Sequence, residues 1–139
     1  MNKQVLDLSS FAKAVKTLKE ALAEHAKDKT NLFVRDSVIQ RFEYTYELSH
    51  KMLKRFLLYS EFSGQDIAEM VFSNIIRTAN EKGLLLNNLE KWEEYRKIRN
   101  MTSHTYDEIK AKLVVAIVPE FLQEAVFLLE QLQQRSKKL

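Results

Sequence analysis

The chain has 139 residues and contains no cysteine, one proline and two glycines. Without cysteine it has no disulfide, no thiolate metal ligand and no cysteine nucleophile. So few glycines and prolines argue against a sheet-rich domain, because tight turns depend on them. No apolar run approaches the roughly 20 residues of a membrane span, and the first ten residues lack the apolar core of a signal peptide. We therefore expect a cytoplasmic protein that does not enter a membrane.

The charged residues point only weakly to a partner. The net charge of +3 permits contact with nucleic acid but is too small to indicate it. Cations cluster at 51–55 and at 96–99; each cluster alone is typical of a solvated surface, whereas two beside one groove would suit a polyanion. His50 has no carboxylate or histidine at metal-ligand spacing, and phosphate-binding glycine loops and nucleophile elbows are absent. We expect neither a metal nor a cofactor.

Apolar residues at alternating spacings of three and four predict amphipathic helices along the chain. The first apolar seam covers 8–22, the turn is expected at 23–31, and the second helix is expected from about 32 to 59. Thr45 and Ser49 interrupt the second seam. We interpret them as small residues that let a neighbouring helix approach closely.

A break is expected at 60–65, followed by a third helix capped by Ser63, with Asp66 in its first turn. Gly83 is placed to end that helix in a left-handed conformation. Its apolar face is expected to comprise Ile67, Met70, Val71, Ile75 and Ala79.

Two capping boxes predict where the later helices begin. Asn87 with Glu90, and Thr105 with Glu108, have the required spacing, so helices are expected to start at Asn87 and at 106. Pro119 is expected to kink or divide the last helix. The apolar seam then continues to 132, and the tail from 134 is expected to fray. The sequence thus predicts one all-α domain over 1–139, an up-and-down four-helix-type bundle of five or six helical pieces.

The stretch 99–106 carries the side chains best suited to chemistry. Arginine offers a permanent forked cation for phosphate, and histidine readily moves protons near neutral pH. Arg99 and His104 would lie about 140° apart around a continuous helix. A helix–break–helix corner, as the capping box at Thr105 predicts, would let both side chains converge on one cleft beside a helix N-terminus that favours phosphate.

This arrangement favours metal-free phosphoryl transfer on RNA, whose 2′-hydroxyl is its own nucleophile. His104 would act as general base or acid, and Arg99 would stabilise the charge on the phosphate oxygens. One histidine serves one proton position, so a two-fold dimer would supply both acid and base. The simpler alternative is that Arg99 and His104 only stabilise the negative end of a helix.

The same stretch resembles the R-x4-H-x-Y signature of HEPN-domain proteins, and in particular the nucleotidyltransferase substrate-binding, or HepT-like, family. Residues 42–48 followed by Lys51, and Gly83 to Leu85 with Trp92 downstream, agree with that family's pattern. His50 departs from it, because the family typically carries tryptophan there. The resemblance covers nearly the whole chain.

This resemblance implies a dimerising helical bundle in which the motifs of two subunits line a shared cleft. It implies a small nucleotidyltransferase as partner, and for many members a toxin that cleaves RNA without metal. Arg99 and His104 would then be catalytic, and Asn100 a supporting polar residue. Tyr106 would receive AMP from ATP through the partner, which acts as antitoxin.

Two other functions compete with a ribonuclease toxin. The chain could be a non-catalytic subunit that presents a substrate or nucleotide to the nucleotidyltransferase, or a plain helical dimerisation protein. The intact motif favours a ribonuclease toxin over a plain helical dimerisation protein. It does not separate the ribonuclease from the binding subunit, since both could use a basic, phosphate-binding cleft.

Overall fold

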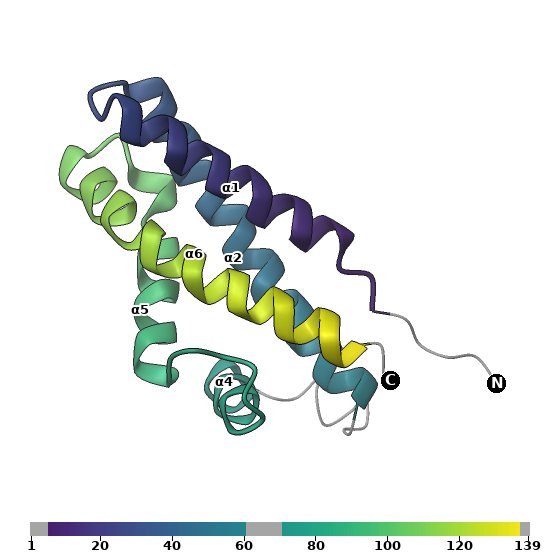
Figure 1. The fold of residues 1–139 in the computed structure, drawn as a ribbon. Helices are drawn as coiled ribbons and strands as arrows, with labels where there is room; N and C mark the ends of the chain where they lie inside the picture. Colours follow the sequence, from purple (N-terminus) through teal and green to yellow (C-terminus); the bar gives the residue numbers. More distant parts are fainter. Residues whose placement is uncertain (1–5, 61–70, 137–139) are drawn as a thin grey trace.

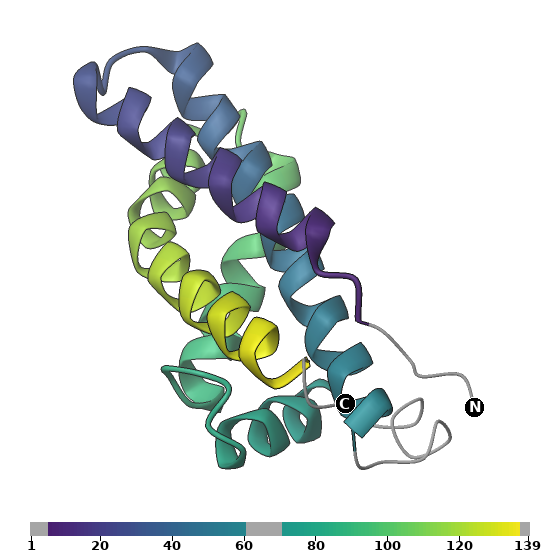
Figure 2. The same cartoon turned by 45° about the vertical axis from the view of Figure 1, so that its right-hand side comes forward.

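A computed structural model describes residues 6–60 and 71–136 of the chain, and helices are the only regular secondary structure in this part. Its helices are α1 (Ser9–Lys27), α2 (Leu32–Ser60), α4 (Phe72–Glu81), α5 (Leu89–Arg99), the short 3-10 helix η1 (Thr102–His104) and α6 (Glu108–Ser136). Figures 1 and 2 show α1, α2 and α6 as the long elements, with α5 at a steep angle to them. The all-α bundle is therefore confirmed. No helix within the described ranges is long and apolar enough to cross a membrane.

The first two helices form an antiparallel pair whose seams are buried as predicted. Thr45 and Ser49 are fully buried in α2, and the Thr45 hydroxyl donates to the carbonyl of Arg41 at 2.6 Å while lying 3.4 Å from the carbonyl of Ala14 in α1. The small side chains therefore bring α1 against the backbone of α2. The turn is shorter than expected, because α1 continues to Lys27.

The turn between α1 and α2 is set by side chains that hydrogen-bond to the local backbone. Asp28 accepts hydrogen bonds from the amide and hydroxyl of Thr30 at 3.0 and 2.5 Å. Asn31 accepts from the amide of Phe33 at 3.0 Å and so caps α2. Residues 23–27 lack such a breaker and remain helical, which explains why the expected turn was too long.

The third predicted helix is only partly covered by the structure. Its expected break and cap, with Ser63, and the first part of its apolar face lie outside the described residues. Ile75 and Ala79 are buried in α4 as predicted, whereas Val71 is 59 % exposed and precedes the helix. Gly83 adopts φ +74°, the left-handed conformation predicted for it.

The starts of α5 and α6 correct the capping-box predictions. Helix α5 begins at Leu89 rather than Asn87, and the Asn87 side chain instead donates to Glu124 at 3.0 Å. Helix α6 begins at Glu108, because the Asp107 carboxylate accepts from the amide of Ile109 at 2.9 Å and caps the helix in place of Thr105. Asp107 is a strong capping residue nearer to the helix, so it defines the start.

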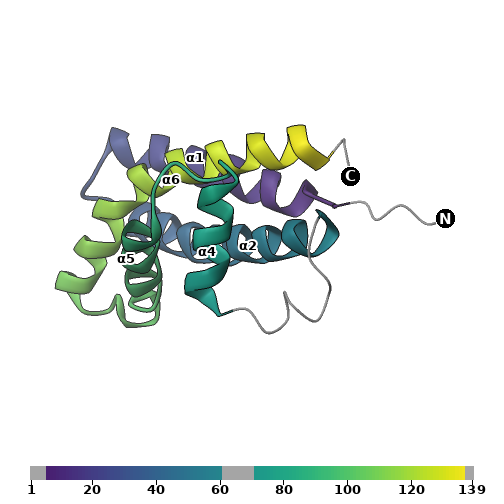
Figure 3. The same ribbon diagram turned by 90° about the horizontal axis from the view of Figure 1, so that it is seen from below.

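Helix α6 completes the core. Its predicted seam from Val114 to Leu132 is buried, and the ring of Phe121 meets Phe42 and Tyr95 edge to face at 5.1 and 5.2 Å. Pro119 lies inside α6 without dividing it. Figure 3 shows the earlier and later parts of α6 running in different directions, which is the kink predicted for a helix-internal proline.

Candidate functional site

Arg99 is the last residue of α5, and α2 fixes its guanidinium. Its Nε lies 2.5 Å from Glu47 Oε1, and its Nη2 lies 3.7 Å from Glu43 Oε1. Glu43 and Glu47 are one turn apart on α2, so both carboxylates face the same side of the helix. The Arg99 side chain is 30 % exposed. The cation is thus oriented by two carboxylates and still reaches solvent.

Arg99 and Asn100 open onto a cavity of about 270 Å³. The cavity lies where α5 meets α2 and the first residue of α4. Besides those two residues it is lined by Tyr46, Glu47, His50, Phe72 and Arg96. The structure therefore brings the predicted catalytic arginine and the predicted supporting asparagine together at one hollow.

Arg96 gives this cavity a second cation. It precedes Arg99 by one turn of α5, and its Cζ lies 4.7 Å from the centre of the Phe72 ring. A guanidinium stacked on an aromatic face keeps its N–H edges free for an anion. Tyr46 lies in the same wall, and burial raises the pKa of its phenol to about 12, so it remains a neutral donor.

His104 and Tyr106 form a second, exposed part of the motif. The break between α5 and α6 is real: η1 ends at His104, whose amide donates to the carbonyl of Met101 at 2.9 Å. The His104 Nδ1 lies 3.4 Å from the Tyr106 hydroxyl, and Tyr106 is 86 % exposed. His104 is not among the residues that line the cavity of Arg99. The predicted helix–break–helix corner is therefore present. Arg99 lines the cavity and His104 does not, so the two side chains do not converge on this cavity.

His50 is a cavity residue that the sequence interpretation did not assign to the site. Its ring stacks on Phe72 with centroids 5.5 Å apart, and its Nε2 is buried without a hydrogen-bond partner. Burial, followed by the nearby charge of Lys54, lowers the pKa of His50 below its ordinary 6.5. The available signal was its spacing from Glu43 and Glu47, which puts all three on one face of α2.

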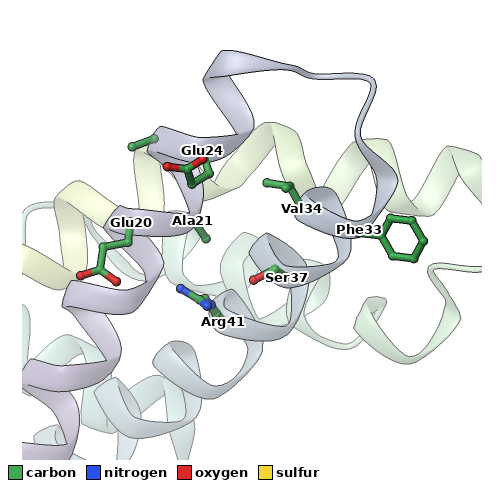
Figure 4. A pocket seen from close by; sticks show the side chains of 8 residues that line it. Glu20, Ala21, Glu24, Phe33, Val34, Ser37 and Arg41 are labelled. Carbon is green, nitrogen blue, oxygen red and sulfur yellow. The ribbon is translucent and has the colours of Figure 1, made fainter.

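A larger hollow lies elsewhere. About 580 Å³ is open between the end of α1 and the start of α2, and Figure 4 shows Glu20, Glu24 and Arg41 around it. Arg41 is the one cation among the described residues that line it, and it already donates to the carbonyl of Thr17 at 2.7 Å. None of the motif residues lines this hollow.

No group of three histidine or carboxylate side chains within 6–60 and 71–136 is arranged to hold a metal ion. The motif and the cavity beside it present arginine, histidine and polar side chains. These are the types used to bind phosphate and to move protons.

Comparison with known proteins decides the family. The model of the family described as nucleotidyltransferase substrate binding protein like matches residues 6–134. The chain belongs to this family. A curated Haemophilus influenzae protein named "Probable ribonuclease HepT" is 40 % identical over an alignment of 141 residues. The alignment covers 99 % of this chain and 95 % of that protein.

A solved structure from Haemophilus influenzae, described as the fold of a substrate binding domain of a nucleotidyltransferase, superposes on the chain with a TM-score of 0.85. The two are 37 % identical, and the match covers 91 % of this chain and 99 % of the other. The resemblance to the nucleotidyltransferase substrate-binding family, which the sequence motifs suggested, is thus confirmed over most of the chain.

Proposed function

We propose that the chain is a metal-independent ribonuclease that acts as a toxin controlled by a small nucleotidyltransferase. The main support is the position of Arg99. Glu47 of α2 orients its guanidinium, which lines a cavity together with Asn100. The turn that carries His104 follows directly in the chain. The relative named "Probable ribonuclease HepT" supports the same reaction class.

In the proposed reaction the RNA supplies the nucleophile. His104 accepts the proton of a 2′-hydroxyl, and the 2′-oxygen attacks the adjacent phosphorus. The O2′–P bond forms and the P–O5′ bond breaks, which leaves a 2′,3′-cyclic phosphate. The departing 5′-oxygen takes a proton from a second acid. Arg99 stabilises the charge that develops on the phosphate oxygens.

A second copy of the chain would supply that acid. The exposed His104 serves one proton position at a time, and a two-fold arrangement of two motif corners would provide a base from one subunit and an acid from the other. The proposed ribonuclease is therefore a homodimer with its cleft between two motifs.

Tyr106 is the proposed point of control. Its side chain is 86 % exposed, so the active site of a second protein could reach the hydroxyl. The phenol oxygen would attack the α-phosphorus of ATP, pyrophosphate would leave, and the phenol proton would pass to a base of the nucleotidyltransferase. The added AMP would carry a negative charge next to His104, whose Nδ1 is 3.4 Å from that hydroxyl. It would repel RNA and block the histidine.

One observation favours the alternative of a non-catalytic nucleotide-binding subunit. Arg99 is already paired with Glu47, and the cavity it lines does not include His104. A cavity with two arginines could hold a nucleotide phosphate for the nucleotidyltransferase without any cleavage.

Cleavage of RNA in the presence of EDTA separates the two functions. Arg99→Ala and His104→Ala should each reduce cleavage about 100-fold or more, because each removes a group that stabilises charge or moves a proton in the transition state. His25→Ala, which removes a histidine at the end of α1, should cleave like the parent. Mass spectrometry must first show that Tyr106 carries no AMP. Equal cleavage by all variants would reveal a contaminating nuclease, and no cleavage by any would favour the binding subunit.

The proposed control is tested with the purified nucleotidyltransferase and ATP. Treatment should add one AMP to the parent chain, detectable by mass, and should abolish its RNA cleavage. Tyr106→Phe should gain no mass, whereas Tyr44→Phe, which removes another surface phenol, should still be modified. Modification of Tyr106→Phe to the same extent would refute the assignment.

A further inference from the structure

We propose that the cavity lined by His50, Phe72 and Arg96 is a subsite for the RNA phosphate next to the one that is cleaved. Arg96 would contact that phosphate, and His50 would hydrogen-bond to the same nucleotide. The inference rests on the proposed function in two respects: RNA is the ligand, and Arg99 contacts the phosphate that is cleaved.

Arg96 is the second cation that lines this cavity. No carboxylate pairs with it in the described part of the chain, whereas Arg99, one turn later on α5, is held by Glu43 and Glu47. Its guanidinium lies over the face of Phe72, with Cζ 4.7 Å from the centre of the ring. A guanidinium held over an aromatic ring at a cavity wall is already oriented and keeps its N–H edges free for an anion.

His50 provides an independent observation in the same wall. Its Nε2 is buried and has no hydrogen-bond partner, although its ring is held against Phe72. Buried polar atoms are normally paired, so an orphan at a cavity wall points to a group that the chain itself does not contain. A nucleotide entering the cavity, with a small turn of the imidazole, would supply that partner.

The charges around the cavity favour an anion of small size. Its lining carries two cations, Arg96 and Arg99, and one carboxylate, Glu47. Glu43 lies beside Arg99 but is not among the lining residues. A volume of about 270 Å³ is at the lower end for ligand pockets, so it has room for part of one nucleotide and not for a folded segment. Residues three apart on a helix are neighbours, so Arg96 and Arg99 could contact consecutive phosphates of one strand.

The test uses a short RNA that is 2′-O-methylated throughout, which cannot be cleaved because its 2′-oxygens carry no proton. Arg96→Ala should weaken binding about tenfold and reduce the slope of log K against log salt by about 0.7. Lys97→Ala is the matched control, since it removes an exposed cation from the adjacent position of α5. It should change the affinity less than about twofold. Equal losses for both variants, or no binding by the parent chain, would overturn the subsite.

His50→Phe tests the second contact, because phenylalanine keeps a ring to pack on Phe72 but has no ring nitrogen. Binding of the methylated RNA should weaken about fivefold, with a thermal midpoint close to that of the parent or higher. Unchanged binding would remove His50 from the proposal.

Cleavage of unmodified RNA by the parent chain reports separately on the proposed ribonuclease. If the parent binds through Arg96 but cleaves nothing, the ribonuclease fails, and the cavity stands as a subsite for an RNA phosphate without a neighbouring cleavage site. If it cleaves RNA while Arg96→Ala binds and cleaves normally, the subsite alone fails.

Discussion

Glu124 is buried and His50 is half-buried, and the hydrogen bonding of these two ionisable groups differs. Glu124 in α6 is fully buried and accepts hydrogen bonds from the amide of Leu86 at 2.6 Å, the amide of Asn87 at 3.1 Å and the side chain of Asn87 at 3.0 Å. His50 in α2 has a buried Nε2 with no partner. A buried polar group with hydrogen-bond partners holds the segments that supply those partners in place. A buried polar atom without a partner is available to a group from outside the chain.

The positions of the two groups explain why the difference matters. Glu124 holds the connection between α4 and α5, and so fixes where α5 begins. The other end of α5 carries Arg96 and Arg99 at the cavity of His50. The Glu124 contacts therefore determine the position of the helix on which the candidate site depends, while His50 belongs to the site itself.

Glu124→Ala should have the largest effect on stability. It leaves the amides of Leu86 and Asn87 and the Asn87 side chain without their acceptor, and an unpaired buried donor costs about 1–3 kcal/mol. We expect the free energy of unfolding in urea to fall by about 3 kcal/mol or more. Glu124→Gln keeps one carbonyl acceptor and should lose less. An unchanged unfolding free energy for Glu124→Ala would end the comparison with His50.

What the sequence could predict follows from how local each interaction is. The seams of α1, α2 and α6 and the left-handed Gly83 depend on neighbours within a turn or two, and these predictions hold. Glu124 lies three residues after Phe121 in the seam, which was a signal of burial. Its partners at 86–87 are far away in the chain, so no spacing could reveal them.

The candidate site also has a part that depends on local interactions, which could be predicted, and a part that depends on long-range packing, which could not. The corner that carries Arg99 and His104 was predictable from poor helix formers and capping residues, although Asp107 displaced Thr105 as the cap. The cavity was not predictable, because α2, α4 and α5 contribute its walls and only their packing brings His50 and Phe72 to Arg96.

Glu124 and His50 should change the free energy of unfolding in opposite directions as the pH falls. Burial raises the pKa of Glu124 above its ordinary 4.5, although the hydrogen bonds from 86–87 oppose the rise. The folded chain therefore binds this proton more readily than the unfolded chain, and the Glu124 contribution to stability grows as the pH falls towards 4.5. Burial lowers the pKa of His50 below 6.5, so its contribution is complete above 6.5 and is lost as the pH falls below it.

Unfolding in urea between pH 4.5 and 6.5 separates these contributions. Relative to the parent, Glu124→Gln should lose the gain on acidification, and His50→Phe should lose the decline. Each difference involves at most one proton, so it should be smaller than the effect of Glu124→Ala. Parallel profiles for all three proteins would show that neither group titrates differently on folding.

The smallest effect on stability is expected for His50→Phe at neutral pH, where the imidazole is uncharged. The substitution removes a buried nitrogen that no partner satisfies and keeps an aromatic ring against Phe72. We therefore expect the free energy of unfolding to stay within about 1 kcal/mol of the parent or to rise. A loss as large as that of Glu124→Ala would mean that His50 has a structural partner in solution and that the two ionisable groups are alike. A stable variant with weakened RNA binding would instead separate them, because a residue kept for a ligand costs affinity when replaced and a residue kept for the fold costs stability.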